Sequence, residues 1–298
     1  MQLSVNIRNL FGRYPFEKCA ELYKDAGFTC IDYSLEEMVY DLNVFNSENW
    51  RAHAEEVRRG ADRLGLRINQ THAPFTFRNW NNEDYYQTVI YPRLCRSLEI
   101  SAILGAEICV MHPLHHFVYH GNEEEIFETN MRFYRGLIPL CREFNIKIGI
   151  ENMWQVDPRR KFIVYDVCGT KEEFVRYIDT LDSTYMVACL DVGHVGLPMG
   201  DDEVQDFIYA LGHDRLKALH IHDNDYRGDQ HYLPFMGKLN WEAITKALGE
   251  IDYTGDFTYE VGVHIIAGAP DDFVPVGLRY IYDVGNYLIR KIEENRVR

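Results

Sequence analysis

Basic residues are scarce in this sequence of 298 residues. Lysine and arginine number 31 against 46 aspartate and glutamate residues, which gives a formal net charge of −15. Surfaces that bind nucleic acid rely on basic stripes that release counterions from the phosphate backbone. The acidic balance therefore argues against a polyanionic partner, and we expect no nucleic-acid partner.

Long apolar runs are missing as well. No segment approaches the roughly 18 apolar residues of a membrane span. The N-terminal segment, MQLSVNIRNLFGRYPF, has no charged leader followed by a long apolar stretch, which is the pattern of a secretory signal. We expect a soluble, cytoplasmic protein that has no membrane partner.

Paired cysteines are also absent, and no CxxC motif occurs. The seven cysteines stand singly: Cys19, Cys30, Cys95, Cys109, Cys141, Cys168 and Cys189. Several lie inside apolar patterns such as EICVM and VACLD, which is typical of small buried hydrophobic residues in a reducing compartment. We predict that none of them is catalytic.

What the sequence does contain is an alternation of strand-like and helix-like segments along its whole length. The strand-like runs are 3–7, 28–35, 67–72, 106–112, 146–151, 186–191, 216–222 and 256–260. The helix-like segments are near 16–26, 48–64, 85–104, 123–144, 171–181, 201–212, 241–250 and 274–294. Eight such units predict the α/β class and a single (β/α)8 TIM barrel, which needs roughly 250 residues. We expect residues 1–298 to form one domain.

Six of these strand-like runs end in a residue that can bind a metal ion or transfer a proton. They are His72, His112, Glu151, Asp191, His222 and Glu260. In a parallel barrel the C-terminal ends of all strands meet on one face, so residues far apart in sequence surround a single pocket. His194 lies three residues after Asp191 in CLDVGHVG, a spacing that lets both reach the same metal ion or neighbouring ones.

A second local cluster lies in ALHIHDNDYRGDQH. Strand alternation places His220 and His222 on the same face, with His222 nearer the end of the strand. Asp229 and His231 follow in the loop. Carboxylates and imidazoles in this combination suit Mn²⁺, Zn²⁺, Co²⁺ or Mg²⁺.

Six motifs, in this order and spacing, resemble the xylose isomerase-like TIM barrel superfamily: THAP, VMHP, GIEN, LDVGH, HIHDND with DQH, and YEVG. This superfamily includes sugar-phosphate isomerases and epimerases, inosose dehydratase-like enzymes and endonuclease IV. The resemblance spans roughly residues 3–290. It implies a divalent-metal-dependent sugar or sugar-phosphate isomerase or epimerase with a small-molecule sugar or sugar phosphate as its partner, and it leaves a homo-oligomer open.

Carried over residue by residue, the ketose 3-epimerase branch implies that Glu151, Asp191, His222 and Glu260 bind one divalent metal ion. It also implies that Glu151 and Glu260 act as the acid/base pair, transferring a proton through an enediolate. His220 remains the alternative to His222, because HIHD and HDND both resemble the motif of the seventh strand.

The same positions resemble the endonuclease IV pattern, in which nine residues hold three zinc ions. Here these residues would be His72, His112, Glu151, Asp191, His194, His222, Asp229, His231 and Glu260. The resemblance therefore allows more than one bound metal ion. It also allows two other activities, those of a zinc phosphodiesterase acting on abasic DNA and of a polyol dehydratase. The segment LPFMGKLNW lacks the second Gly-Glu-Gly element that relatives often have, which leaves the loop geometry open.

Substrate contacts are expected on the same rim. The predicted substrate-binding residues are His72, His112, His194, Trp154 and Arg227. Aromatic side chains that are candidates for stacking on a sugar are Phe75, Phe77, Trp80 and Trp154. The basic residues 159–161 are expected to be solvated rather than to bind phosphate. The long loop over residues 152–170 is expected to cover the pocket, because long loops on a compact barrel usually serve a site.

Overall fold

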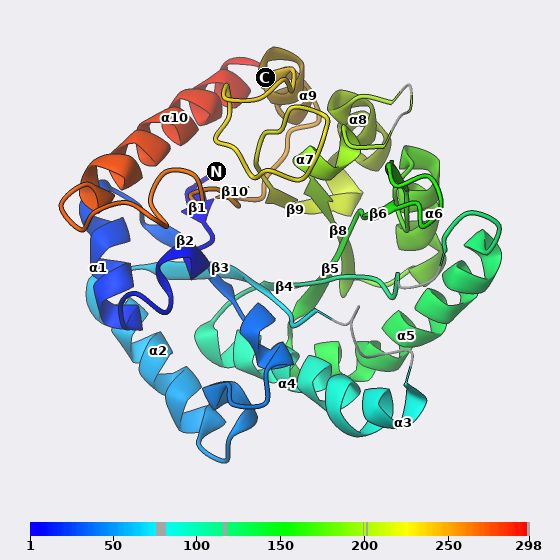
Figure 1. Ribbon diagram of the computed structural model, residues 1–298, viewed down its shortest axis with the longest axis horizontal. Helices are drawn as coiled ribbons and strands as arrows, with labels where there is room; N and C mark the ends of the chain where they lie inside the picture. The colour runs from blue at the N-terminus through cyan, green and yellow to red at the C-terminus, as the bar shows by residue number, and fades with distance from the viewer. Residues whose placement is uncertain (76–81, 116–117, 199, 201, 297–298) are drawn as a thin grey trace.

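The structure is a computed structural model and describes residues 1–75, 82–115, 118–198, 200 and 202–296. Within these residues, eight parallel strands form a ring that is surrounded by helices (Figure 1). The strands are β1 (Leu3–Val5), β2 (Cys30–Ser34), β3 (Arg67–His72), β4 (Ile108–Met111), β5 (Lys147–Glu151), β8 (Met186–Asp191), β9 (Leu216–His220) and β10 (Phe257–Tyr259).

The ring closes at the seam between the first and the last strand. Strands β2, β3, β4, β5, β8 and β9 form one continuous sheet in that order, while β1 pairs with β10. Single parallel bridges, Asn6 with Asp32 and Ile221 with Tyr259, join the two sheets. The predicted (β/α)8 barrel is therefore confirmed.

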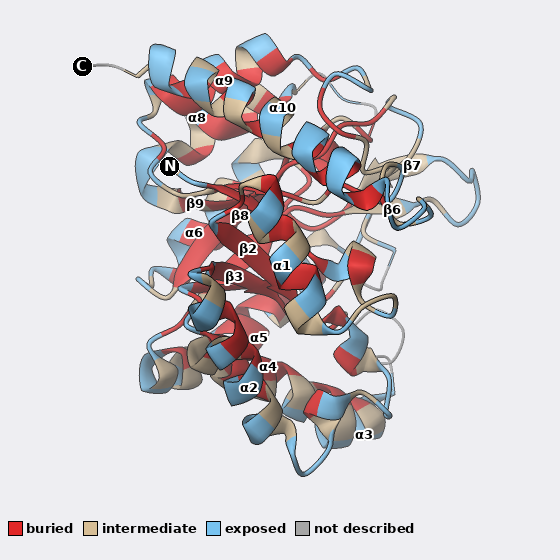
Figure 2. Cartoon of the chain, turned by 90° about the vertical axis from the view of Figure 1, so that its left-hand side faces the viewer, coloured by how far each residue is buried: buried red, intermediate tan, exposed pale blue. Residues whose placement is uncertain are grey.

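Most helices lie outside the strands (Figure 1). The helices are α1 (Phe16–Ala26), α2 (Trp50–Leu64), α3 (Glu83–Tyr85), α4 (Tyr91–Leu104), α5 (Glu123–Phe144), α6 (Lys171–Leu181), α7 (Val192–Val195), α8 (Val204–Arg215), α9 (Trp241–Glu250) and α10 (Val274–Glu294). The single turn α7 directly follows β8 at the strand ends. Short 3₁₀ turns are η1 (Arg8–Leu10), η2 (Glu36–Val39) and η3 (Val44–Asn46). Buried residues follow the strands and the helix faces that meet them (Figure 2).

The helix expected near 85–104 differs from a single regular helix. The chain forms the short α3, then a π-helical turn η4 (Tyr86–Ile90), and only then α4. Pro92 lies in the first turn of α4 and has no N–H to donate to the preceding turn. The irregular backbone before this proline is consistent with that missing donor.

The barrel interior has an apolar layer beneath the polar strand ends. Five buried side chains form this layer: Ile108, Val110, Val187, Cys189 and Ala218. Several of them precede a polar strand-end residue by two positions, so they lie on the same inward face. Gly149 leaves room for the layer, because a Cβ there would lie 3.1 Å from Ile108 and 3.2 Å from Cys189. The polar residues above thus lie over a closed apolar floor.

Six of the seven cysteines are buried, and Cys95 is partly exposed. All seven thiols are free, and burial raises the pKa of Cys19 to about 11 and that of Cys30 to about 12. Such thiols are poor nucleophiles, since the thiolate is the reactive form. Among the described residues, none of the helices combines the length and apolar character that a membrane crossing requires.

Candidate metal centre and active site

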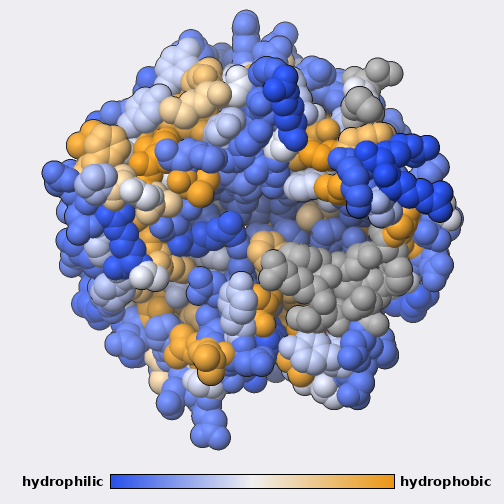
Figure 3. Space-filling view, viewed as in Figure 1, coloured by the Kyte–Doolittle hydropathy of each residue, from blue (hydrophilic) through white to orange (hydrophobic). Residues whose placement is uncertain are grey.

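Ten acidic and histidine side chains gather at the C-terminal ends of the strands, and we call them the strand-end cluster. They are His72, His112, Glu151, Asp191, His194, His220, His222, Asp229, His231 and Glu260. They come from the ends of six strands, β3, β4, β5, β8, β9 and β10, and from the segments that follow β8 and β9. Figure 3 shows a largely hydrophilic hollow at the centre of the face viewed in Figure 1. All nine residues of the predicted multi-metal set are brought together here.

The first part of the cluster joins β3, β4 and β5. The Nε2 atoms of His72 and His112 lie 3.1 Å apart, and that of His112 lies 3.1 Å from Oε2 of Glu151. Nδ1 of His72 is 2.8 Å from the carbonyl oxygen of Ala73, which fixes the ring with Nε2 pointing inward. Burial lowers the pKa of His112 to about 4, so its imidazole is neutral, as a metal ligand must be.

The second part lies at the centre of the barrel, where the imidazole of His220 separates two glutamates. Its Nδ1 is 3.2 Å from Oε1 of Glu151, and its Nε2 is 3.7 Å from Oε1 of Glu260. One ligand atom each of Glu151, Asp191 and His220 lies within 4.8 Å of the others. A second group, formed by His72, His220 and Glu260, lies on the other side of the same imidazole ring, so His220 belongs to both groups.

The third part is formed by α7 and the loop after β9. Oδ2 of Asp229 lies 3.4 Å from Nε2 of His194 and 3.3 Å from Nε2 of His231. His222 stacks on His231 with ring centroids 4.1 Å apart. Its Nε2 is 3.0 Å from Oδ1 of Asp191 and 3.6 Å from Oδ1 of Asp229.

His220 and His222 therefore occupy different places, although both point into the barrel. Asp191 pairs with His220 in the sheet, because a bulge between Ala188 and Cys189 shifts the register of β9 against β8. His220 is thus level with Asp191 and lies between the glutamates. His222 is two residues further along and lies toward Asp229.

Charge in the cluster is balanced by imidazolium groups. Burial alone would raise the pKa of Glu260, but His220 and His231 lower it to about 2. Burial likewise opposes protonation of His231, yet Asp229 raises its pKa to about 9. For His220, the neighbouring Cys189, Glu260 and Glu151 outweigh burial and raise the pKa well above its usual value. The buried carboxylates of the cluster are thus stabilised in their charged form by the neighbouring histidines.

Several buried polar atoms of the cluster lack hydrogen-bond partners among the described residues. They are Nδ1 of His112, Oε2 of Glu151, both ring nitrogens of His220, Nδ1 of His222 and Oδ1 of Asp229. The close contacts of Glu151 and His220 noted above lack hydrogen-bond geometry. Buried polar atoms are rarely left unpaired in folded proteins. Carboxylate and imidazole atoms in this state fit a divalent cation as the missing partner.

Asn152 is a residue of this site to which the sequence assigned no role. Its Nδ2 donates to the carbonyl oxygen of Asp191 at 3.0 Å, and its Oδ1 accepts from the N–H of Asp191 at 2.8 Å. Its carbonyl oxygen also lies 2.8 Å from Nδ1 of His194. The asparagine of the GIEN motif therefore ties the end of β5 to the end of β8 and orients His194.

Asp223 was also missed, and it organises the loop after β9. Its buried carboxylate accepts bonds from one indole N–H, that of Trp241 at 2.9 Å, and from four backbone N–H groups. The backbone donors are Asn224, Phe235, Gly237 and Leu239, at 2.9 to 3.1 Å. The same loop carries Asp229 and His231. Although the loop lacks the second Gly-Glu-Gly element, the hydrogen bonds to Asp223 fix its conformation.

A cavity of about 340 Å³ opens above Glu151 and Glu260. Its rim includes Phe75 and also Trp154, which lies on β6 (Trp154–Val156). This strand pairs with β7 (Ile163–Tyr165), so part of the loop expected to cover the pocket is a β-hairpin. The rim also includes residues that the sequence did not suggest: the ion pair of Arg8 with Glu36, and His115, whose Nδ1 is 3.0 Å from Oδ2 of buried Asp166.

Not every predicted substrate contact is brought to this cavity. His72, His112, His194 and Trp154 line it. Arg227 is exposed and is not part of its lining. Residues 159–161 are exposed as well, as expected for a solvated segment. Phe77 and Trp80 lie outside the described residues.

Comparison with known proteins places the chain among similar barrels. A solved D-tagatose 3-epimerase-like protein superposes with a TM-score of 0.75 over 99% of both chains at 21% identity. The protein y4fM of Sinorhizobium fredii is 25% identical, over 80% of this chain and 79% of its own length. A D-psicose 3-epimerase of Enterocloster bolteae is 26% identical, over 67% of this chain and 63% of its own. Residues 20–283 match the family model described as xylose isomerase-like TIM barrel, and the chain therefore belongs to that family.

Proposed function

We propose that the protein is a divalent-metal-dependent isomerase or epimerase of sugars, with Glu151 and Glu260 as its acid/base pair. The observation that carries this proposal is the position of the two glutamates on either side of His220, at the floor of a cavity of about 340 Å³. The likeness to sugar epimerases supports it. Two carboxylates facing one reacting carbon are what a proton shuttle between its faces requires.

Glu151, Asp191, His220 and Glu260 are the proposed ligands of one metal ion. We choose His220 for this set because its ring lies between the two glutamates. His222, the histidine predicted from the sequence, remains the alternative, since its Nε2 lies 3.0 Å from Oδ1 of Asp191. The donor set suits Mn²⁺, Co²⁺, Zn²⁺ or Mg²⁺. A metal ion held there would polarise a carbonyl group and its neighbouring hydroxyl, and so acidify the proton between them.

The residues of the chain then divide the reaction between them. One glutamate removes the proton from the carbon beside the carbonyl, and the other returns a proton. Return to the opposite face of the same carbon gives an epimer, while delivery to the adjoining carbon gives an aldose or ketose isomer. His112, His194 and Trp154 line the cavity. In this proposal the two imidazoles form hydrogen bonds with sugar hydroxyls, and the indole of Trp154 packs against a sugar ring.

A second candidate is a zinc phosphodiesterase that acts on abasic DNA. It is favoured by the three neighbouring parts of the strand-end cluster, which could hold more than one metal ion. The charge of the chain disfavours it, since 46 acidic residues face 31 basic ones and a duplex needs cations along its path. A polyol dehydratase begins with the same proton abstraction and is compatible with the same glutamates.

The test is metal analysis followed by a screen for solvent deuterium incorporation. Purified protein should hold a divalent metal, and ketoses or their phosphates should gain deuterium beside the carbonyl in D₂O. Glu151→Gln and Glu260→Gln, with metal kept saturating, should lose epimer formation. Incision of abasic duplex without any sugar exchange would instead favour the phosphodiesterase, and release of water from a polyol acid would favour the dehydratase.

A further inference from the structure

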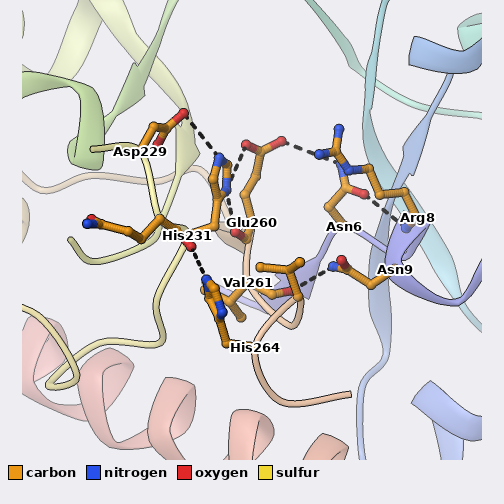
Figure 4. Close-up of a pocket in the computed structure, with 10 residues that line it drawn as sticks. Asn6, Arg8, Asn9, Asp229, His231, Glu260, Val261 and His264 are labelled. Atoms are coloured by element: carbon orange, nitrogen blue, oxygen red, sulfur yellow. Dashed lines mark hydrogen bonds and ion pairs between the residues drawn. The ribbon is translucent and has the colours of Figure 1, made fainter. Parts of the chain in front are cut away.

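A second cavity adjoins the one above the two glutamates. It has a volume of about 400 Å³ and lies between the segments that follow β1 and β10 (Figure 4). We call it the seam lobe, and the cavity described above the metal-side lobe. Both cavities share four residues: Arg8, Asp229, His231 and Glu260. The two lobes therefore meet at one wall, and Glu260 belongs to both.

The seam lobe differs from the metal-side lobe in its chemistry. The residues that line it alone are Asn6, Asn9, Gln230, Val261, Val263 and His264. None of these six side chains is a carboxylate, a lysine or an arginine. Amides and an imidazole beside two valines offer hydrogen bonds and apolar contact without charge, a lining suited to a neutral hydroxylated group.

Hydrogen bonds within the lobe hold these groups in place. Nδ2 of Asn9 donates to the carbonyl oxygen of Val261 at 3.0 Å, which turns the side-chain oxygen of Asn9 into a fixed acceptor. Nε2 of His264 is 2.7 Å from the carbonyl oxygen of Gln230, so the ring donates there and Nδ1 remains an acceptor. The lobe is thus preorganised around acceptor atoms.

The shared wall disfavours an anion in the seam lobe. Its one guanidinium, Arg8, forms an ion pair with Glu36, which is buried. The carboxylates of Asp229 and Glu260 lie on the same wall. A phosphate or carboxylate would therefore face two carboxylates. The guanidinium still has further N–H groups for an uncharged oxygen.

We propose that the seam lobe is a second sugar-binding subsite, and that the substrate class is a glycosylated ketose or disaccharide rather than a free monosaccharide. This inference rests on the proposed function, since it takes the reacting sugar to lie in the metal-side lobe. Each lobe alone falls in the range of roughly 300–1,000 Å³ that is typical of small-molecule pockets. When the reacting sugar lies above Glu151, the second sugar attached to it would lie in the seam lobe. Arg8, which lines both lobes, would then lie beside the glycosidic oxygen that joins the two sugars.

The experiment compares two matched compounds on the metal-loaded protein. One is a free ketohexose, and the other is the same ketohexose with a glucosyl group on the hydroxyl furthest from the carbonyl. Affinity is measured by calorimetry, and turnover by deuterium incorporation beside the carbonyl. We expect the glucosyl compound to bind at least about tenfold more tightly, which is the effect of one or two hydrogen bonds.

A filling substitution localises the effect. Val263→Trp should place a large ring in the seam lobe, and Val263 is 46% exposed, so the fold should tolerate it. We expect this variant to lose the preference for the glucosyl compound while metal content and affinity for the free ketose stay within about twofold. Val276→Trp is the matched control, because Val276 is 59% exposed on α10 and lines neither lobe. His264→Ala should weaken the same preference.

The outcomes separate the two proposals. Equal affinity for both compounds, or an equal effect of Val263→Trp on both, would overturn the second subsite. A preference for the glucosyl compound that Val263→Trp removes, without deuterium incorporation in either compound, would keep the subsite and overturn the proton-transfer function.

Discussion

Nδ1 of His220 lies 3.2 Å from Oε1 of Glu151, although the two residues stand on β9 and β5. Strand β8 separates them in the sheet, so their contact crosses the barrel interior rather than a strand pair. This contact is the reason for assigning His220 to the glutamates in our proposal.

Replacing the two neighbouring histidines should have unequal effects on metal content. His220→Ala removes the imidazole between Glu151 and Glu260. Affinity for the central metal ion should therefore fall by more than the roughly 10–100-fold that follows removal of a hydrogen-bond partner of a metal ligand. His222→Ala should leave at least one metal ion per chain. Metal content is measured by mass spectrometry, with exposed His213→Ala as the control. Full metal content in the His220 variant, with loss in the His222 variant, would restore His222 as the ligand.

Metal affinity should rise with pH and binding should release protons. Without metal, the proposed ligand His220 has a pKa well above its usual value. His231, a candidate ligand of an additional ion, has a pKa raised to about 9, and both shifts occur despite burial. A metal ion needs the neutral imidazole, so it competes with the bound protons below these pKa values. Affinity should therefore increase from pH 6 to 9. Calorimetry in buffers with different ionisation enthalpies would count the protons, and pH-independent affinity with no proton release would contradict the assignment.

The two glutamates should fail in different ways. Glu→Gln at either position removes a proton carrier and a charge near the reacting carbon, so turnover should fall by more than the ~10²–10⁴ credited to acid–base catalysis alone. The glutamate that faces the labile proton is needed for exchange with solvent, while the other is needed only for delivery from the opposite face. With an epimerisable ketose, one variant should still exchange deuterium without forming epimer. Near wild-type turnover in both would contradict the two-carboxylate mechanism.

Removing the Asn152 side chain should cost stability. Asn152→Ala would leave the buried N–H and carbonyl oxygen of Asp191 without the bonds they make now, which costs about 1–3 kcal/mol for such a group. Urea unfolding of the metal-free protein measures this difference. Asn122→Ala is the control, since Asn122 is exposed and its amide donates only to Val118, and its effect should be within about 0.5 kcal/mol. Equal effects would show that the link between β5 and β8 matters little.

Duplex DNA with an abasic site should bind weakly at any salt concentration. The net charge is −15, and affinity for duplex DNA comes chiefly from phosphate contacts that release counterions. Fluorescence anisotropy at low and moderate salt tests this expectation. Submicromolar affinity that falls steeply with salt, together with strand incision, would promote the phosphodiesterase over the sugar enzyme.

Much of the architecture could be predicted from the sequence, because the same alternation of an apolar strand-like run and a helix-like segment repeats along the chain. The helices expected near 16–26, 123–144, 171–181, 241–250 and 274–294 are present with those bounds. The strand ends were equally visible, since each apolar run stops at a polar residue such as Glu151 or Asp191. A barrel brings these ends together whatever the details of its loops.

What the sequence could not reveal depends on neighbours far along the chain. The positions of His220 and His222 relative to Asp191 depend on a bulge between β8 and β9, and a bulge is a property of a strand pair. The carboxylate of Asp223 finds its donors in a loop with no regular period. Arg8 lies in the turn η1 after β1, and Glu36 lies in the turn η2 after β2. The two side chains form an ion pair because these two strands are adjacent in the barrel.

The seam between β1 and β10 has a consequence for biosynthesis. Glu260 follows β10, and the barrel closes only when that strand pairs with β1. A nascent chain on the ribosome therefore carries the other strand-end residues before it can assemble the complete centre. Domains generally fold as units once their chain has emerged, so this protein should acquire its fold and its proposed metal centre in the same late step, and truncated translation products should have neither.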